Sequence, residues 1–363
     1  MALSEFSIIQ QYFTHEGLNF GVPGVDLGPG DDCALLSIDS SAQLAITLDV
    51  LQEGVHFPVD TVPELLAWHG LAVNLSDLAA MGAEPLCFTL GLSLPRADPV
   101  WLENFSKGLA SCAGRYRCAL AGGDLTRGPL SLAIQAHGLV PKGEAVLRSG
   151  AQPNDLVFVT GTLGDAAAAL LVLDHFGCHV SAVHGVDGMH FTALTAAYRD
   201  CFLNAYYTPL PQIAAGMALR GRASAAIDIS DGLLADLGHI TAASGVGACI
   251  NLPDLPLSEA MKSCVTTERA LKLAAAGGDD YQLCFTVPAS DSEALVAKMT
   301  ELEVAVTCIG KIIEGTGVHC LDEKGRQVSV DGPGYRHFDN HDGAEGGREA
   351  RGEHASERNG DRR

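Results

Sequence analysis

Residues 225–233, with the sequence AAIDISDGL, place two aspartates where a strand turns into a helix. The apolar residues up to Ile229 predict a buried strand, and Gly232 predicts a turn before the helical pattern of residues 233–243. In extended backbone Asp228 and Ser230 point to the same side, and Asp231 then begins the turn. Ser230 and Asp231 also fit a simple helix cap. Carboxylate and hydroxyl oxygens grouped in this way suit a hard cation such as Mg²⁺.

Four further acidic strings have the same character, at glycine turns, near strand ends or on an apolar helix. They are GDDCA at residues 30–34, TLD at 47–49, NLSD at 74–77 and GGD at 122–124. Each by itself is also compatible with a polar turn or a solvent-facing carboxylate. Together they indicate more than one bound metal ion, and a site with several Mg²⁺ ions usually handles phosphate. The strings therefore predict phosphoryl transfer.

The composition limits the partners that such a protein accepts. The chain has 363 residues, is 47% hydrophobic and carries a formal net charge of -21. This charge repels nucleic acid, and it admits an anionic substrate only through bound cations. The 11 cysteines form no CxxC pair, which favours reduced thiols in the cytoplasm. Neither a signal-peptide pattern nor an apolar run of about 18 residues is visible, so we expect no membrane partner.

Strand and helix patterns alternate along the chain, which predicts an α/β (α+β) fold. Strands are expected at 33–38 and 44–48 (as a hairpin), 88–94, 119–121, 131–140, 156–160, 225–229, 281–287 and 304–313. Helices are expected at 6–13, 63–81, 99–116, 165–176, 233–243, 292–302 and in a segment ending at 276. We expect an N-terminal metal-binding and dimerisation domain at 1–142, a C-terminal nucleotide and substrate domain at 143–338, and a disordered tail at 339–363.

Common nucleotide-binding motifs are missing from the chain. There is no G-x-x-x-x-G-K-[ST] phosphate loop and no G-x-G-x-x-G after a strand. ATP binding would therefore require a different architecture.

The order and combination of the strings resemble the thiamine-monophosphate kinase family, within the aminoimidazole ribonucleotide synthetase-like superfamily. Further strings that carry the likeness are EGVHF at 53–57, RSGA at 148–151 and GGDDY at 277–281. The resemblance runs from about Glu5 to Phe338. It implies ATP-dependent phosphorylation of thiamine monophosphate to thiamine diphosphate with Mg²⁺. It also implies a homodimer whose N-terminal sheets pair into a barrel, with a C-terminal α/β domain.

The resemblance also implies which residues form the site. The metal positions fall on Asp32, Thr47, Leu48 (through its carbonyl oxygen), Asp49, Asp77, Asp124, Asp228 and Asp231. The ATP contacts fall on Gly122, Gly123, Arg148 and Ser230, and the substrate contacts on His56, Asp279 and Tyr335. Catalysis would depend on Asp49, Asp77, Asp124 and Arg148. Asp279 stands where the family has glutamate, so its side chain is shorter by one methylene.

Two alternatives remain at this point. The chain could be another ATP-using member of the superfamily, such as the cyclo-ligase, selenophosphate synthetase or the hydrogenase maturation dehydratase. Selenophosphate synthetase would need a reactive cysteine in the N-terminal segment, whereas the first cysteine here is Cys33. The maturation dehydratase would need a C-terminal cysteine, whereas the last residue here is Arg363. The chain could also bind nucleotide or divalent cations without catalysis.

Overall fold

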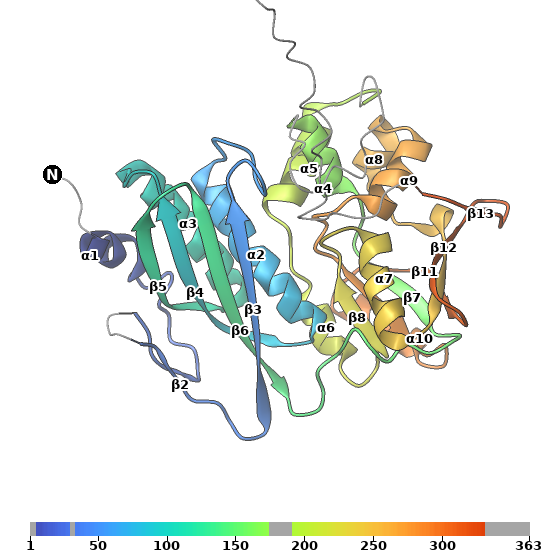
Figure 1. The fold of residues 1–363 in the computed structure, drawn as a ribbon, viewed down its shortest axis with the longest axis horizontal. Helices are drawn as coiled ribbons and strands as arrows, with labels where there is room; N and C mark the ends of the chain where they lie inside the picture. The colour runs from blue at the N-terminus through green and yellow to red at the C-terminus, as the bar shows by residue number, and fades with distance from the viewer. Residues whose placement is uncertain (1–4, 30–32, 174–190, 331–363) are drawn as a thin grey trace, which may run out of the picture.

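The computed structural model describes residues 5–29, 33–173 and 191–330, which form two α/β parts lying side by side (Figure 1). Each part contains one main β-sheet with helices packed against it. Asp32, Tyr335 and the tail at 339–363 lie outside the described residues. The mixed α/β architecture that the sequence predicts is confirmed, and the exact domain boundary at 142/143 stays a prediction.

The N-terminal part is built on a four-stranded sheet with the order β3-β6-β4-β5. Its strands are β3 (Ala42–Gln52), β4 (Glu84–Leu94), β5 (Ala119–Arg127) and β6 (Ser131–Pro141). β6 pairs antiparallel with both β3 and β4, whereas β4 and β5 are parallel and are joined through helix α3 (Pro99–Tyr116). Among the described strands, β3 and β5 are therefore the two open edges of this sheet.

Helix α2 (Pro63–Ala80) lies at the centre of the molecule, between the four-stranded sheet and the C-terminal part (Figure 1). It is apolar on nearly all sides, which is typical of a helix that is buried all round. Gly108 of α3 and Gly216 of α6 (Ile213–Leu219) let both helices approach it closely. A Cβ atom at Gly216 would lie 2.0 Å from the carbonyl oxygen of Ala79. The position of α2 is therefore fixed from several directions.

The C-terminal part contains a seven-stranded sheet with the order β13-β12-β9-β11-β7-β10-β8. The strands are β7 (Leu156–Thr160), β8 (Ala225–Asp228), β9 (Gly247–Asn251), β10 (Leu283–Val287), β11 (Val306–Ile313), β12 (Gly317–Leu321) and β13 (Gln327–Val328). All pairs are antiparallel except β9 with β12. Its helices are α4 (Asp165–Val172), α5 (Ala196–Tyr207), α6, α7 (Leu233–Ser244), α8 (Glu259–Cys264), α9 (Thr267–Ala276) and α10 (Ser292–Glu301), with a short 3₁₀ turn at Leu252–Asp254. β8 ends at Asp228, whose side chain contacts α2.

Several predicted elements differ from those observed. The predicted hairpin of residues 33–38 and 44–48 is wrong, because β2 (Leu35–Leu36) pairs with β1 (Val25–Leu27) and β3 pairs with β6. The predicted N-terminal helix appears as α1 (Glu5–Ile8) followed by the π-helical turn Ile9–Phe13. α4 ends at Val172 rather than at residue 176, and α5, α6, α8, β9 and β12 had no counterpart in the sequence prediction.

Two global expectations can be compared with the described residues. None of the helices described is both long and apolar enough to cross a membrane. The ten cysteines in the described segments are all free thiols, and several of them are buried among apolar side chains.

Candidate functional site

A cleft of about 510 Å³ lies where β3 and α2 of the N-terminal part meet the end of β8. Its walls combine acidic, apolar and aromatic side chains. The lining residues are Leu48, Asp49, Val50, Leu51, His56, Val73, Asp77, Asp228, Ser230, Asp231 and Tyr281. Seven of the residues singled out from the sequence therefore line one cleft, and they come from segments up to 183 positions apart (48 to 231).

Strand β3 and helix α2 hold two of the carboxylates. Asp49 lies inside β3 and not beyond its end, because the strand continues to Gln52. Its backbone N–H donates to the Asn74 side-chain oxygen at 3.2 Å, which ties the strand to α2. Three residues further along α2, Asp77 accepts a short hydrogen bond from the Thr47 hydroxyl. Thr47 and Asp49 alternate with Leu48 along the strand, so both face α2 while Leu48 faces the opposite side.

The third carboxylate comes from the C-terminal part. Asp228 is the last residue of β8 and is 4% exposed. Its side chain accepts a hydrogen bond from the Ser76 hydroxyl at 2.8 Å, which spans the two parts of the molecule. Ser76 and Asp77 are adjacent on α2. Through them the helix is bonded to β3 at Thr47 and to β8 at Asp228.

The negative charges of the carboxylates in the cleft repel one another. Burial raises the pKa of Asp49 to about 7, and the nearby charge of Asp77 adds to the effect. Burial likewise raises the pKa of Asp228 to about 7, with Asp77 again contributing. The pKa of Asp77 is also raised by burial, although the Thr47 hydrogen bond and the positive charge of Arg148 lower it in part. Arg148 lies in the connection between the two parts and is exposed. A bound cation would relieve this repulsion.

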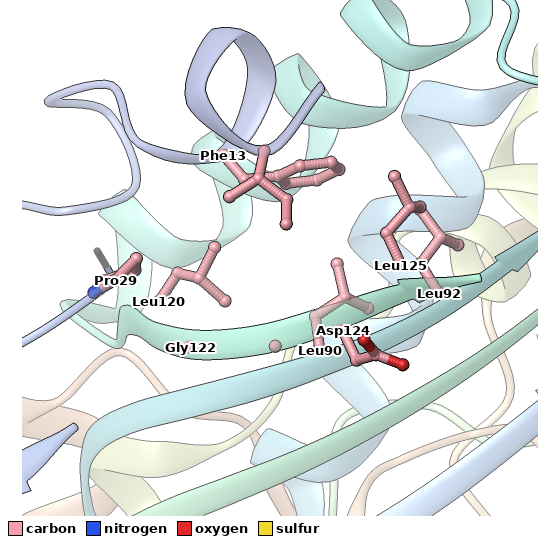
Figure 2. A pocket seen from close by; sticks show the side chains of 10 residues that line it. Phe13, Pro29, Leu90, Leu92, Leu120, Gly122, Asp124 and Leu125 are labelled. Carbon is pink, nitrogen blue, oxygen red and sulfur yellow. The ribbon is translucent and has the colours of Figure 1, made fainter. Parts of the chain in front are cut away.

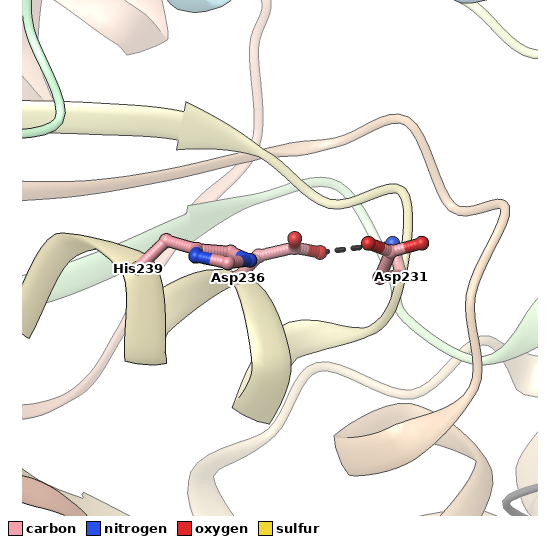
Figure 3. A group of neighbouring side chains, drawn as sticks. All are labelled: Asp231, Asp236 and His239. Atoms are coloured by element: carbon pink, nitrogen blue, oxygen red, sulfur yellow. Dashed lines mark hydrogen bonds between the residues drawn. The ribbon is translucent and has the colours of Figure 1, made fainter. Parts of the chain in front are cut away.

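The turn after β8 carries Ser230 and Asp231, which both line the cleft. Figure 3 shows Asp231 in this turn, next to Asp236. Asp236, in the first turn of α7, accepts hydrogen bonds from the backbone N–H groups of Ser230 at 3.0 Å and of Asp231 and Gly232 at 3.1 Å. Burial raises the pKa of Asp236, as do the charges of Asp228 and Asp231. Sequence analysis missed Asp236; its position in the first turn of the predicted helix was the available signal.

His56 lies in the loop between β3 and α2 and forms part of the cleft wall. Its Nδ1 accepts the backbone N–H of Gln52 at 3.0 Å, and its carbonyl oxygen accepts the hydroxyl of Tyr206 at 2.8 Å. Tyr206 belongs to α5, so the C-terminal part helps to hold this loop. Nδ1 is therefore engaged within the loop.

Asp279 is 2% exposed and lies outside the residues that line the cleft. Its Oδ1 accepts the hydroxyl hydrogen of Tyr281 at 3.1 Å, and Tyr281 itself lines the cleft. Both residues adopt left-handed backbone, with φ of 65° and 48°. Such conformations are costly for residues other than glycine and often occur near functional sites. The sequence singled out Asp279, but Tyr281 is the residue of this turn that faces the cleft.

Gly122, Gly123 and Asp124 lie elsewhere, on the edge strand β5 (Figure 2). They border an apolar pocket formed with Ile9, Phe13, Pro29, Leu90, Leu92, Leu120 and Leu125. Figure 2 shows Phe13 on one side of β5 and the Asp124 carboxylate turned to the other. Because β3 and β5 are opposite edges of the four-stranded sheet, three strand spacings of about 14 Å in total separate Asp124 from Asp49. One chain therefore does not bring Asp124 to the acids of the cleft.

Comparison with known proteins agrees with this architecture. The chain matches the family described as AIR synthase related protein, with its N-terminal domain at residues 30–140 and its C-terminal domain at residues 152–322. Thiamine-monophosphate kinase of Escherichia coli strain K12 is 45% identical over 338 residues, which is 93% of this chain and 99% of the relative. The Haemophilus influenzae enzyme of the same name is 42% identical over 87% of this chain and 92% of the relative.

Solved structures give the same result. The crystal structure of thiamine-monophosphate kinase from Stenotrophomonas maltophilia has a TM-score of 0.75 and 44% identity, covering 84% of this chain and 92% of that one. AaThiL complexed with AMPPCP and TMP has a TM-score of 0.68 and 30% identity, covering 85% and 91%. These matches extend through both parts of the molecule. The chain is a member of the thiamine-monophosphate kinase family.

Proposed function

We propose that this chain transfers the γ-phosphoryl group of ATP to thiamine monophosphate, giving thiamine diphosphate and ADP. The observation that carries the proposal is the convergence of Asp49, Asp77 and Asp228 in one cleft, from three different elements. The family relationship supports the substrates, because a relative 30% identical to this chain is described in complex with AMPPCP and TMP.

The reaction needs little covalent chemistry from the protein. A phosphate oxygen of thiamine monophosphate is already anionic, so it attacks the γ-phosphorus of ATP without a strong general base. The bond from that phosphorus to the bridging oxygen breaks as the new one forms, and ADP leaves. The residues of the cleft then have to align the two anions and exclude water. Arg148, whose charge reaches Asp77 and Asp228, supplies a fixed positive charge beside the reacting phosphates.

The donor set of the cleft suits Mg²⁺. Its polar oxygens come from carboxylates and hydroxyls, and the raised pKa values of Asp49 and Asp228 indicate negative charge that is poorly balanced. We assign magnesium binding to Thr47, the Leu48 carbonyl oxygen, Asp49, Asp77, Asp228 and Asp231, with Asp124 and Asp32 completing the set. When bound, Mg²⁺ neutralises charge on the two phosphate-bearing reactants.

The remaining contacts follow the same scheme. Gly122 and Gly123 expose backbone beside the apolar pocket of β5, which suits the adenine base and the start of the triphosphate. Ser230 completes the ATP site. His56, Asp279 and Tyr335 are assigned to thiamine monophosphate, and for Asp279 this role requires movement of its turn or action through Tyr281.

The enzyme is a homodimer in this proposal. Ile46, Leu48 and Val50 on β3 are each more than half exposed, although they form an apolar row on the face of the sheet opposite α2. A second copy that covers this face and pairs β5 against β3 would remove both open edges. It would also bring Asp124 of one copy toward Asp49 of the other, so each site would draw on both chains. The free thiols further favour a reducing compartment, the cytoplasm.

An acceptor assay tests the function. The purified chain is incubated with ATP and Mg²⁺, and ADP is measured with thiamine monophosphate, with thiamine, or with no acceptor. We expect ADP to form only when thiamine monophosphate is present, and in the same amount as thiamine diphosphate. ADP formation that does not depend on thiamine monophosphate would indicate another ATP-using reaction. If no ADP forms, the chain would instead be a protein that binds nucleotide or divalent cations without catalysis.

A further inference from the structure

The turn at the start of α7 has an unusual arrangement of hydrogen bonds. The backbone N–H groups of Ser230, Asp231 and Gly232 all donate to one oxygen, Oδ2 of Asp236, at 3.0 to 3.1 Å. Asp236 is 2% exposed, and Figure 3 shows its carboxylate directed at the turn. Successive N–H groups that converge in this way form an anion-binding nest.

The same turn is fixed from its other side. The carbonyl oxygen of Ser230 accepts the N–H of Asp279 at 2.9 Å, and that of Ile229 accepts the N–H of Tyr281 at 2.8 Å. Gly232 has a φ of 113°, and a Cβ atom there would lie 2.9 Å from the carbonyl oxygen of Ala276. The backbone of the turn is therefore engaged on both sides, and its side chains are the groups left to face the cleft.

This arrangement changes how the helix N-terminus can be used. Free N–H groups at the start of a helix commonly bind a phosphate. Here the three N–H groups already have an internal carboxylate as their acceptor, so a phosphate of the substrate has no access to them. The turn offers the cleft the hydroxyl of Ser230, which can bond a phosphate, and the carboxylate of Asp231, an oxygen ligand for a cation.

We propose that Asp236 is a positioning residue whose carboxylate occupies this nest and holds Ser230 and Asp231 toward the cleft, where Asp231 binds the cation and Ser230 contacts ATP. The inference rests on the proposed function for the nature of the cation. Asp231, Asp236 and His239 also have ligand atoms within 4.8 Å of one another. Direct coordination by Asp236 through its other oxygen, Oδ1, is the competing role, because Oδ2 already accepts the three N–H groups.

The test compares Asp236→Ala and Asp236→Asn with Asp155→Ala. Asp155 is a matched control because it is 5% exposed and accepts the Gln152 N–H at 2.9 Å and the Ser224 hydroxyl at 2.6 Å, away from the lining of the cleft. Binding of Mn²⁺ is titrated without nucleotide by electron paramagnetic resonance. We expect Asp236→Ala to weaken binding by about tenfold or more, since it removes charge-assisted hydrogen bonds. Formate, which can refill the nest, should restore binding to this variant, and neither effect should occur in Asp155→Ala.

Asp236→Asn separates positioning from coordination. Its carboxamide oxygen can still accept the three N–H groups, so this variant should retain most of the Mn²⁺ affinity. A loss as large as in Asp236→Ala would instead identify Asp236 as a metal ligand and overturn the proposal. Wild-type affinity in Asp236→Ala, or no response of that variant to formate, would overturn it as well.

Hydrogen exchange of the wild-type chain gives a test that no unfolded variant can obscure. The amides of residues 230–232 should be strongly protected, and inorganic phosphate should not slow their exchange further. Fast exchange, or added protection by phosphate, would show that the nest is open and contradict the proposal. Because this measurement uses neither ATP nor thiamine monophosphate, its failure is distinct from a failure of the acceptor assay.

Discussion

At the scale of one residue, Asp228 shows how the buried charges of the cleft lower the stability of the folded protein in the absence of a cation. Its pKa is raised from 3.8 to about 7, first by burial and then by Asp77. The folded protein therefore binds this proton more tightly than the unfolded chain does. The unfavourable effect on stability is absent below about pH 4, grows as the pH rises, and is complete above about pH 7.

Asp228→Asn should therefore stabilise the metal-free protein at pH 8. The amide keeps an oxygen that can accept the Ser76 hydroxyl, and it removes the buried charge. We expect the melting temperature in EDTA to rise by roughly 2–4 °C, the change that about 1 kcal/mol produces in a domain of this size. The difference from wild type should vanish near pH 4. A lower melting temperature than wild type at pH 8 would contradict the charge repulsion inferred for this site.

Single residues were only partly predictable from the sequence. The residue types around Asp49, Asp77 and Asp228 pointed to a cation, because a single carboxylate on an apolar segment is expensive to bury without a compensating charge. The sequence did not predict that Asp279 is buried behind Tyr281. That arrangement depends on left-handed backbone at two residues other than glycine, for which the string GGDDY gives no local signal.

At the scale of elements, α2 positions the site because other helices press closely against it. The Cβ atom of an alanine at Gly216 would meet the Ala79 carbonyl oxygen at 2.0 Å, so α6 and α2 would have to separate. Ala79 lies one helical turn or less from Ser76 and Asp77. A movement of α2 at Ala79 would therefore also displace Ser76 and Asp77.

Gly216→Ala should destabilise the protein by about 1–3 kcal/mol, the usual cost of overpacking. Gly238→Ala is its matched control, because Gly238 is also helical and has no atom within 4 Å of the position of a new Cβ. The control should be neutral or more stable by about 0.5–1 kcal/mol, as expected when alanine replaces glycine inside a helix. Urea unfolding of both variants measures the effect. Equal stability of the two would show that the contact between α2 and α6 is not tight.

Helices with strong patterns were predicted well, whereas strand partners were not. Pro99–Tyr116 was predicted with its observed ends, since an aspartate cap and a clear apolar face mark it. The pairing of residues 33–38 with 44–48 was wrong because β3 finds its partner in β6, about 90 residues further along the chain. Such distant pairing is decided by the packing of the sheet on α2 and not by local residues.

At the scale of the whole molecule, Asp124 is the residue that could join the other acids only in the proposed dimer. The sequence grouped it with the other acids, but the order of strands places it on the opposite edge of the sheet from Asp49. Nothing in the sequence indicated this separation, because the acidic string around Asp124 has the same character as the string around Asp49. If the sites are shared between copies, two different inactive variants should complement one another.

Mixing Asp124→Asn and Asp49→Asn chains tests this sharing. In a heterodimer one site would carry both substitutions, and the other would have Asp124 and Asp49 intact on different chains. Coexpression at equal levels should therefore recover about one quarter of wild-type activity, from the statistics of pairing in a twofold dimer. Homodimers of either variant serve as controls and should be inactive. No recovery in the mixture would mean that each site lies within one chain.

The most direct test of the acidic cleft is the rate of thiamine diphosphate formation by Asp77→Asn at saturating Mg²⁺. Asp165→Asn is the matched variant, because Asp165 is also buried and accepts two hydroxyl hydrogen bonds, from Thr162 and Ser258, outside the cleft. We predict that Asp77→Asn lowers turnover by about 100-fold or more while folding normally, and that Asp165→Asn keeps wild-type turnover. Near-normal turnover in Asp77→Asn would contradict the assignment of this cleft as the site of metal-assisted phosphoryl transfer.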